Sequence, residues 1–208
     1  LCYYLIMNKK KRTFVAINAA AFCLLGAIIF AVTSARVEKT YTNPVLVDTF
    51  IIQREQPDNF SGILGIGDPA VLFHEEKYYL YPTGDNRGYD VYISQDLVNW
   101  QKGPRVFKSS EPGVWAPDVF YNKVDRMFYL YYTVNGRIGV AKAGRPDALF
   151  EDQGTLIDRA IDAHMFVDDD GRYYLYYVEY PGFRIHVQPM ESPLRKKGDP
   201  GYLIQATD

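Results

Sequence analysis

Three aspartates, Asp68, Asp118 and Asp162, have a spacing that could serve chemistry. Each precedes a run of β-branched and aromatic residues, and they lie 50 and 44 positions apart. If these runs are equivalent strands of a repeating fold, their first residues meet around a common centre. Carboxylates converging on one pocket could act as general base and general acid, because close acids push one another's pKa values apart. A repeated structural role would give the same pattern, so the pattern alone leaves both interpretations open.

The stretches around these aspartates belong to a longer internal repeat. Strands are expected at 68–73, 78–81 and 89–94, then at 118–121, 128–132 and 138–142, and then at 162–167, 173–177 and 184–187. The run Asp168 to Gly171 predicts a hairpin turn, because it lacks the alternating ligands of a calcium loop. No stretch after residue 35 shows helical periodicity. A period of about 45 residues with three or four strands per unit is typical of propeller blades, so we expect an all-β propeller.

Aromatic side chains support this expectation. They make up 15% of the 208 residues, and 18 of them are Tyr. Aromatic and β-branched residues favour strands. In a propeller both faces of a middle strand pack on neighbouring blades, so we expect doublets such as Tyr78-Tyr79 and Tyr131-Tyr132 in the core rather than on a ligand-stacking surface.

The N-terminal end has the three parts of a secretory signal peptide. Lys9 to Arg12 form a positively charged start, residues 14–32 an apolar run, and Thr33-Ser34-Ala35 a small-residue cleavage site. Met7 is the expected start, which makes residues 1–6 upstream codons. We therefore expect an exported protein, periplasmic or extracellular. An uncleaved membrane anchor is the alternative, because the apolar run approaches the roughly 20 residues that cross a bilayer.

These features divide the chain into three predicted segments. Residues 1–35 are upstream residues and signal peptide, 36–61 are a lead-in segment, and 62–208 are propeller blades. Without the four basic residues of the leader, 19 of the 23 Lys and Arg residues remain against 25 acidic ones, and they form no basic stripe. This charge pattern argues against nucleic acid as the partner and favours a neutral ligand.

Few residues could hold a metal ion or act as a thiol nucleophile. Cys2 and Cys23 both precede the predicted cleavage site, so thiol catalysis and thiolate metal sites are excluded from the mature domain. The three histidines, His74, His164 and His186, lack the spacing of a zinc site. The sequence therefore identifies no metal ligand and no cofactor.

Three motifs, in this order, resemble the successive blade openings of glycoside hydrolase family 43. They are Gly67-Asp68-Pro69-Ala70-Val71, Trp115-Ala116-Pro117-Asp118-Val119 and the run from Ile161 to Gly171, and Asn43-Pro44-Val45-Leu46 resembles the N-terminal entry of that family. The resemblance covers nearly all of residues 43–208 and is greatest to arabinofuranosidase and xylosidase members. It implies a five-bladed β-propeller, of which this chain carries about the first three blades, and an oligo- or polysaccharide substrate.

Carried over by position, the resemblance assigns different roles to the aspartates. Asp68 matches the general base, which activates water for attack on the anomeric carbon with inversion of configuration. Asp162 matches the carboxylate that orients the general acid and raises its pKa. Asp118 matches a mainly structural position, whereas Trp115 and His164 are the expected sugar contacts. A structural calcium ion in the central channel occurs in some family members, and no residue of this chain is assigned to it.

The general acid of the family is missing from this chain. In the family it is a Glu in a Glu-Gly-Pro stretch on a later blade, whereas only Glu179 and Glu191 follow Asp162, and neither lies in such a stretch. We therefore expect the acid beyond Asp208. At roughly 45 residues per blade the chain supplies three blades of five, and we expect it to be inactive and poorly folded alone. A non-catalytic carbohydrate-binding propeller and a propeller acting on another glycan are the alternatives.

Overall fold

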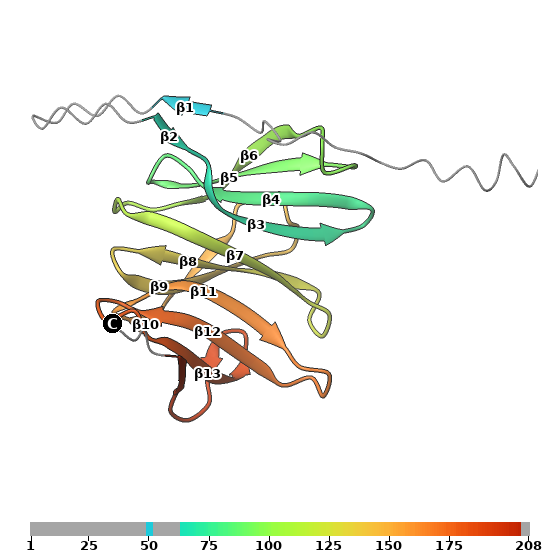
Figure 1. The fold of residues 1–208 in the computed structure, drawn as a ribbon. Coiled ribbons are helices and arrows are strands. Elements are labelled where there is room, and N and C mark those ends of the chain that lie inside the picture. Colours follow the sequence, from blue (N-terminus) through green and yellow to red (C-terminus); the bar gives the residue numbers. More distant parts are fainter. Residues whose placement is uncertain (1–48, 52–62, 205–208) are drawn as a thin grey trace, which may run out of the picture. The chain divides into compact units, whose positions relative to one another are not determined.

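The computed structural model of this chain describes residues 49–51 and 63–204. The predicted signal peptide, most of the lead-in segment and the motif from Asn43 to Leu46 lie outside the described residues. Within them every regular element is a strand, and no helix there is long and apolar enough to cross a membrane. The prediction of an all-β fold is confirmed (Figure 1).

In this part of the chain, three antiparallel sheets follow one another in simple up-and-down order. The first holds β3 (Gly67–His74), β4 (Lys77–Thr83), β5 (Gly88–Ser94) and β6 (Gln101–Lys108). The second holds β7 (Val114–Asn122), β8 (Met127–Val134), β9 (Arg137–Ala143) and β10 (Glu151–Asp158). The third holds β11 (Ala160–Val167), β12 (Tyr173–Glu179) and β13 (Ile185–Ser192), with β14 (Arg195–Lys196) and β15 (Gly201–Ile204) both paired to β13. A separate pair is formed by β1 (Thr49–Ile51) and β2 (Ile63–Gly65).

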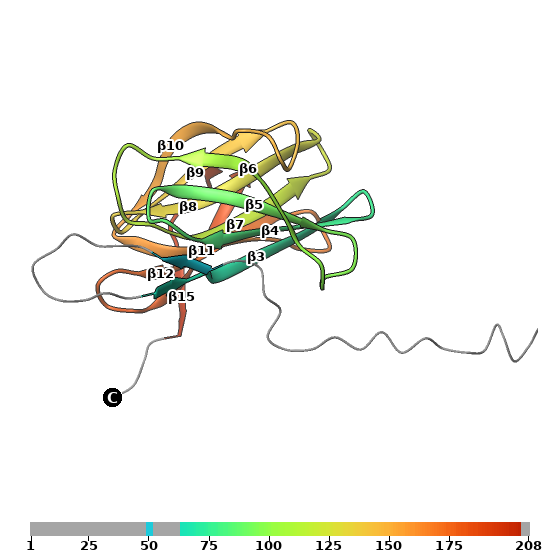
Figure 2. The same ribbon diagram turned by 90° about the horizontal axis from the view of Figure 1, so that it is seen from above.

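The first strands of the three sheets are neighbours in space. Strand β7 lies against β3 and β4 of the first sheet and against β11 of the third. Strands β6 and β10 form the edges of their sheets opposite to β3 and β7, respectively (Figure 2). Sheets whose first strands meet while their last strands point away are arranged as propeller blades.

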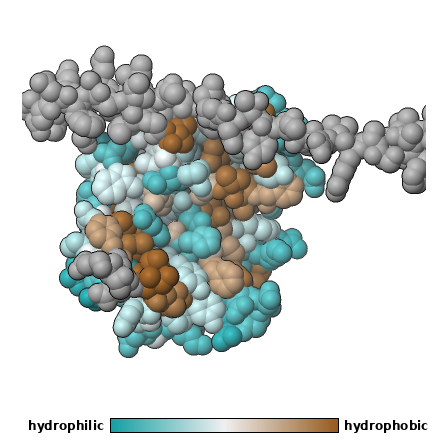
Figure 3. All heavy atoms as spheres, viewed as in Figure 1, coloured by the Kyte–Doolittle hydropathy of each residue, from teal (hydrophilic) through white to brown (hydrophobic). Residues whose placement is uncertain are grey.

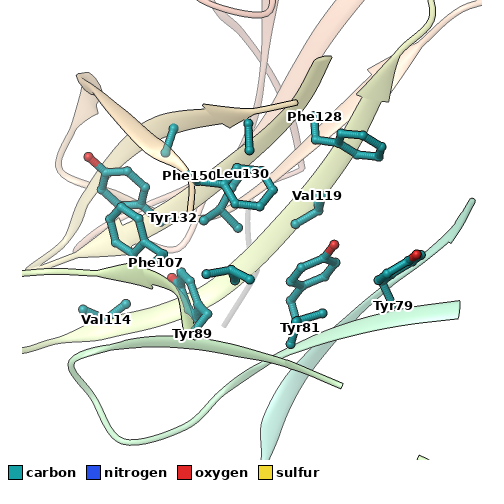
Figure 4. Packing of buried hydrophobic residues seen from close by; sticks show 14 of the residues in the cluster. Tyr79, Tyr81, Tyr89, Phe107, Val114, Val119, Phe128, Leu130, Tyr132 and Phe150 are labelled. Carbon is teal, nitrogen blue, oxygen red and sulfur yellow. The ribbon is translucent and has the colours of Figure 1, made fainter. Parts of the chain in front are cut away.

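The middle strand β8 explains the aromatic runs. Phe128, Leu130 and Tyr132 point into the cluster shared with the first sheet (Figure 4), whereas Tyr129 and Tyr131 point into the cluster shared with the third. None of these five side chains is more than 7% exposed. Because successive side chains of a strand point to opposite faces, a strand between two sheets needs apolar residues at every position. The predicted core role is confirmed for Tyr79, Tyr131 and Tyr132, whereas Tyr78 is only half-buried.

Buried tyrosine hydroxyls join consecutive sheets at equivalent positions. The hydroxyl of Tyr81 in β4 donates to the carbonyl of Pro146 in the second sheet's β9–β10 connection, at 2.8 Å. The hydroxyl of Tyr131 in β8 donates in the same way to the carbonyl of Pro193 beyond β13, also at 2.8 Å. A buried hydroxyl without such a partner would destabilise the fold, so these bonds fix how each sheet sits on the next.

Asp118 of β7 binds across the junction with the third sheet. Its Oδ2 accepts a hydrogen bond from the backbone amide of Met165 at 2.9 Å, and its Oδ1 lies 3.1 Å from Nδ1 of His164. The Asp118 side chain is only 17% exposed. Its hydrogen bond to the imidazole raises the pKa of His164 above the ordinary value of 6.5. Asp118 therefore joins β7 to β11, in agreement with the structural role that the family resemblance implied.

Replacing Asp118 with Ala tests this junction. The Asp118→Ala variant leaves the amide of the buried Met165 unpaired, so we expect the free energy of unfolding to fall by about 1–3 kcal/mol. The ion pair between Asp118 and His164 stabilises the parent protein while the imidazole is charged, and this stabilisation is lost as pH rises through the raised pKa. The loss of unfolding free energy in the variant should therefore be larger at about pH 5 than at about pH 8. Chemical denaturation at both pH values measures it, with Asp169→Ala in the exposed turn as the control. An equal deficit at both pH values would contradict the contribution of the ion pair.

Candidate functional site

A bulge interrupts the first strand of each sheet near its start. The register with the second strand shifts between Gly67 and Ala70 in β3, between Trp115 and Asp118 in β7, and between Ile161 and His164 in β11. The first residue inside each bulge has a left-handed backbone, with φ of +46° at Asp68, +43° at Ala116 and +57° at Asp162. Such angles are uncommon for residues other than glycine, so their recurrence at one repeat position marks the bulge as a defined feature of each sheet.

These bulges correct the predicted alignment of the three aspartates. Ala116 occupies the position that Asp68 and Asp162 occupy in their own sheets, and Asp118 lies two residues further along, at the position of His164. The structural periods are therefore 48 and 46 residues rather than 50 and 44. The alignment was wrong because sequence spacing does not reveal where a bulge adds residues to a strand. Two carboxylates, not three, share the repeat position.

The carboxylate of Asp68 is exposed on β3 and held by one short hydrogen bond. The Thr83 hydroxyl at the end of β4 donates to its Oδ2 at 2.7 Å. The same hydroxyl oxygen accepts the backbone amide of Ala116 at 2.8 Å. Asp68 is thereby linked to the bulge of the next sheet.

The pKa of Asp162 is raised by partial burial and by the charge of Asp68. The surrounding protein removes part of the water from the Asp162 carboxyl, and this partial burial is the main cause that raises its pKa above the ordinary 3.8. The negative charge of Asp68 is the second cause. A charge acts in this way only over short range in water, so the two carboxylates, which belong to β3 and β11, face the same region.

Trp115 borders this region and is anchored at two points. Its indole Nε1 donates to Oδ1 of Asn86 at 3.0 Å, and its carbonyl accepts the hydroxyl of the buried Tyr89 at 2.7 Å. The side chain nevertheless remains 42% exposed and directly precedes Ala116 at the bulge. An aromatic ring held in place and open to solvent can stack on a sugar ring.

His164 follows Asp162 by two residues and is also open to solvent. Its side chain is 64% exposed, while Asp118 fixes the ring through Nδ1. Polar and apolar side chains lie close together on the face of the molecule that Figure 3 shows. Among the first strands, β3 exposes Val71 and β11 exposes Phe166. The structure thus leaves both predicted sugar contacts exposed on first strands, Trp115 on β7 and His164 on β11, the strand that also carries Asp162.

Neither later glutamate points toward the aspartates. Glu179 lies 3.5 Å from His186 and 3.8 Å from Arg184, on the β13 side of its sheet. Glu191 pairs with Arg195 at 2.6 Å. Among the described residues no group of three or more His, Cys, Asp and Glu side chains lies close enough to hold a metal ion.

Three residues of the site were not predicted, namely Thr83, Asn86 and Tyr89. A signal for Thr83 does exist, because Tyr81-Pro82-Thr83 and Tyr131-Tyr132-Thr133 repeat a Tyr-x-Thr pattern. Both threonines bind the bulge amide of the following sheet, since the amide of Asp162 donates to Oγ1 of Thr133 at 3.3 Å. No repeated pattern marks Asn86 or Tyr89.

Comparison with known proteins matches this chain to glycoside hydrolases in sequence and in structure. Residues 65–208 match the model of glycosyl hydrolases family 43. The chain is 30% identical to a β-D-galactofuranosidase of Aspergillus niger over 64% of this chain and 47% of that protein. A thermostable family-43 glycoside hydrolase of known structure is 35% identical, with a TM-score of 0.66 over 81% of this chain and 57% of that one. For an endo-1,4-β-xylanase from Bacteroides thetaiotaomicron the identity is 33% and the TM-score 0.63, over 69% and 54% of the chains.

The matched region contains all three of the sheets described above, and the chain spans about half the length of these relatives. Its structural neighbours in the family are five-bladed β-propellers, and the three sheets are consecutive blades of that fold. From the match over residues 65–208 and the shared architecture, the chain belongs to glycosyl hydrolase family 43.

Proposed function

We propose that this chain is part of an exported glycosidase that hydrolyses O-glycosidic bonds in arabinose- or xylose-containing polysaccharides with inversion of configuration. The observation that carries the proposal is the pair of carboxylates, Asp68 and Asp162, at one repeat position and coupled by charge. Family membership supports the reaction class, and the likeness to a xylanase supports a pentose-containing substrate. Export follows from the predicted leader over residues 1–35.

In this mechanism Asp68 is the general base. Its ionised carboxylate accepts a proton from a water molecule as that water attacks the anomeric carbon. Inversion requires room for the water, so the base and the acid should lie about 6.5–9.5 Å apart. Asp162 is not in that reaction path. Its negative charge raises the pKa of the neighbouring acid, which then still carries a proton to give to the leaving oxygen.

We propose that the general acid and at least one further blade follow the third sheet. Tyr176 lies opposite His164 in the register of the third sheet, as Tyr131 lies opposite Asp118 in the second. Tyr131 donates to a carbonyl of the next sheet, whereas the Tyr176 hydroxyl has no hydrogen-bond partner among the residues that the structure describes. Beside it Phe166 is 43% exposed. Both features are expected of a blade face that a further blade covers in the complete propeller.

The chain of 208 residues alone should therefore not turn over aryl α-L-arabinofuranosides, β-D-xylosides or β-D-galactofuranosides. Extending the reading frame past Asp208 until the ring is complete should restore turnover and identify the preferred sugar. Steady-state assays of both proteins on this panel measure the difference. Turnover by the shorter chain would refute the proposal that its general acid lies beyond Asp208. If the extended protein bound the sugars without hydrolysing them, the carbohydrate-binding alternative would be favoured.

In the extended protein, Asp68→Asn should lower kcat by roughly 10²- to 10⁴-fold, because the amide cannot take the proton from water. KM should change little, since the side chain keeps its size. Asp169→Asn in the exposed β11–β12 turn is the matched control and should leave kcat unchanged. A kcat of Asp68→Asn close to that of the parent would rule out the assignment of the base.

Asp162→Asn should make the same protein more stable at neutral pH. The pKa of Asp162 is raised in the folded state, so between pH 3.8 and the raised pKa the folded protein binds more protons than the unfolded one, and stability falls as pH rises. The Asn side chain does not ionise, so the Asp162→Asn variant avoids that loss of stability. Its Tm should exceed that of the parent at pH 7, and the difference in Tm should vanish as pH falls toward 3.8. Thermal unfolding across this range measures it. A Tm at pH 7 no higher than that of the parent would contradict the electrostatic description.

A further inference from the structure

Thr83 connects the proposed base to the neighbouring sheet. It ends β4 and is half-buried. Its Oγ1 lies 2.7 Å from Oδ2 of Asp68 and 2.8 Å from the backbone nitrogen of Ala116. One hydroxyl therefore touches the bulge of its own sheet through a side chain and the bulge of the next sheet through a backbone amide.

The two contacts fix the direction of the hydroxyl proton. A backbone amide can only donate, so the hydroxyl oxygen must accept from Ala116. The single hydroxyl proton then points to Asp68, whose ionised carboxylate can only accept. Hydrogen bonds to a charged acceptor are the stronger kind, so Oδ2 is held in place. No hydrogen bond to Oδ1 is found among the described residues, which leaves that oxygen available to a water molecule.

The second sheet shows what the same device does without a carboxylate. Thr133 lies opposite Trp115 in β7 as Thr83 lies opposite Gly67 in β3. Its Oγ1 likewise accepts a bulge amide of the next sheet, that of Asp162. The bulge residue of its own sheet, however, is Ala116, which offers no carboxylate. The bond between sheets is thus common to both threonines, and the contact with a carboxylate belongs to Thr83 alone.

The third sheet has no such hydroxyl. Val178 lies opposite Ile161 at the equivalent position, although Asp162 occupies the bulge. Of the two aspartates, only Asp68 has a threonine donor at its side. This difference matches the roles proposed for them, because a base that must face water needs a fixed orientation.

We propose that Thr83 is a positioning residue for Asp68, which turns one carboxylate oxygen toward the attacking water by binding the other. The inference rests on the proposed function, since it assigns the base role to Asp68. A positioning residue acts on the chemical step rather than on sugar binding, so its loss should appear in kcat and not in KM.

Three variants of the extended protein separate this role from a structural one. Thr83→Val should lower kcat by roughly 10- to 100-fold with KM nearly unchanged, because a displaced base still ionises but takes the proton from water less efficiently. Thr83→Ser keeps the hydroxyl and should recover most of the loss. Thr133→Val removes the equivalent bond between sheets, which joins Thr133 to the backbone amide of Asp162 and not to its carboxylate. It should therefore lower Tm as Thr83→Val does while lowering kcat less. Equal losses of kcat in both Val variants, or no recovery with Ser, would overturn the proposal.

Crystal structures of the same variants test the orientation without relying on turnover. In Thr83→Val the carboxylate of Asp68 should leave the position it holds in the parent, and in Thr83→Ser it should keep that position. An unmoved carboxylate in Thr83→Val would overturn the proposal even in an active enzyme. A protein that hydrolyses none of the sugars while Asp68 moves as expected would instead refute the proposed function and leave the contact itself established.

Discussion

The burial of a sheet on both faces by its two neighbours is the constraint on which the rest of this structure depends. The side chains of β8 are nearly inaccessible on either side because the second sheet lies between two others. On the first strand of the first sheet, by contrast, Val71 and Phe73 are 52% and 54% exposed, and Phe166 of the third is 43% exposed. Burial of apolar area contributes about 25 cal/mol per Å², so each added sheet stabilises the one before it. Face-to-face stacking of consecutive sheets also brings β3, β7 and β11 together.

The two aspartates proposed for chemistry lie in the same kind of bulge that joins consecutive sheets. In β7 and β11 the left-handed bulge residue donates its amide to the preceding sheet, Ala116 to Thr83 and Asp162 to Thr133. That backbone conformation costs roughly 1–2 kcal/mol for most residues, and less for aspartate, whose short polar side chain can bond locally. Where the bulge residue is an aspartate, the fold turns a carboxylate toward the region shared by the first strands. Architecture and candidate site therefore depend on one local geometry.

Much of the fold could be predicted because the strands that build it have strong signals. The aromatic runs of β4, β8 and β12 and their spacing predicted the strands and the repeat, and the buried role of the tyrosines holds throughout β8. The outer strands β6 and β10 were missed, because Gly103-Pro104 and Gly154 interrupt them and their half-exposed faces leave no clear alternation. The sequence also did not reveal the bulges. For this reason Asp118 was aligned with Asp68 and Asp162, although Ala116 is the residue at the equivalent position of the second sheet. The role of Thr83 depends on a contact between sheets that no local pattern encodes.

The proposed chemistry makes one outcome decisive, namely the configuration of the first sugar released by the extended protein. A single displacement in which Asp68 activates water must invert the anomeric carbon. Proton NMR recorded within minutes of adding enzyme to an aryl glycoside, before the sugar equilibrates, distinguishes the two anomers. We expect the inverted anomer to appear first. A retained configuration would show that a carboxylate attacks the sugar directly, and it would contradict the assignment of Asp68 as a general base.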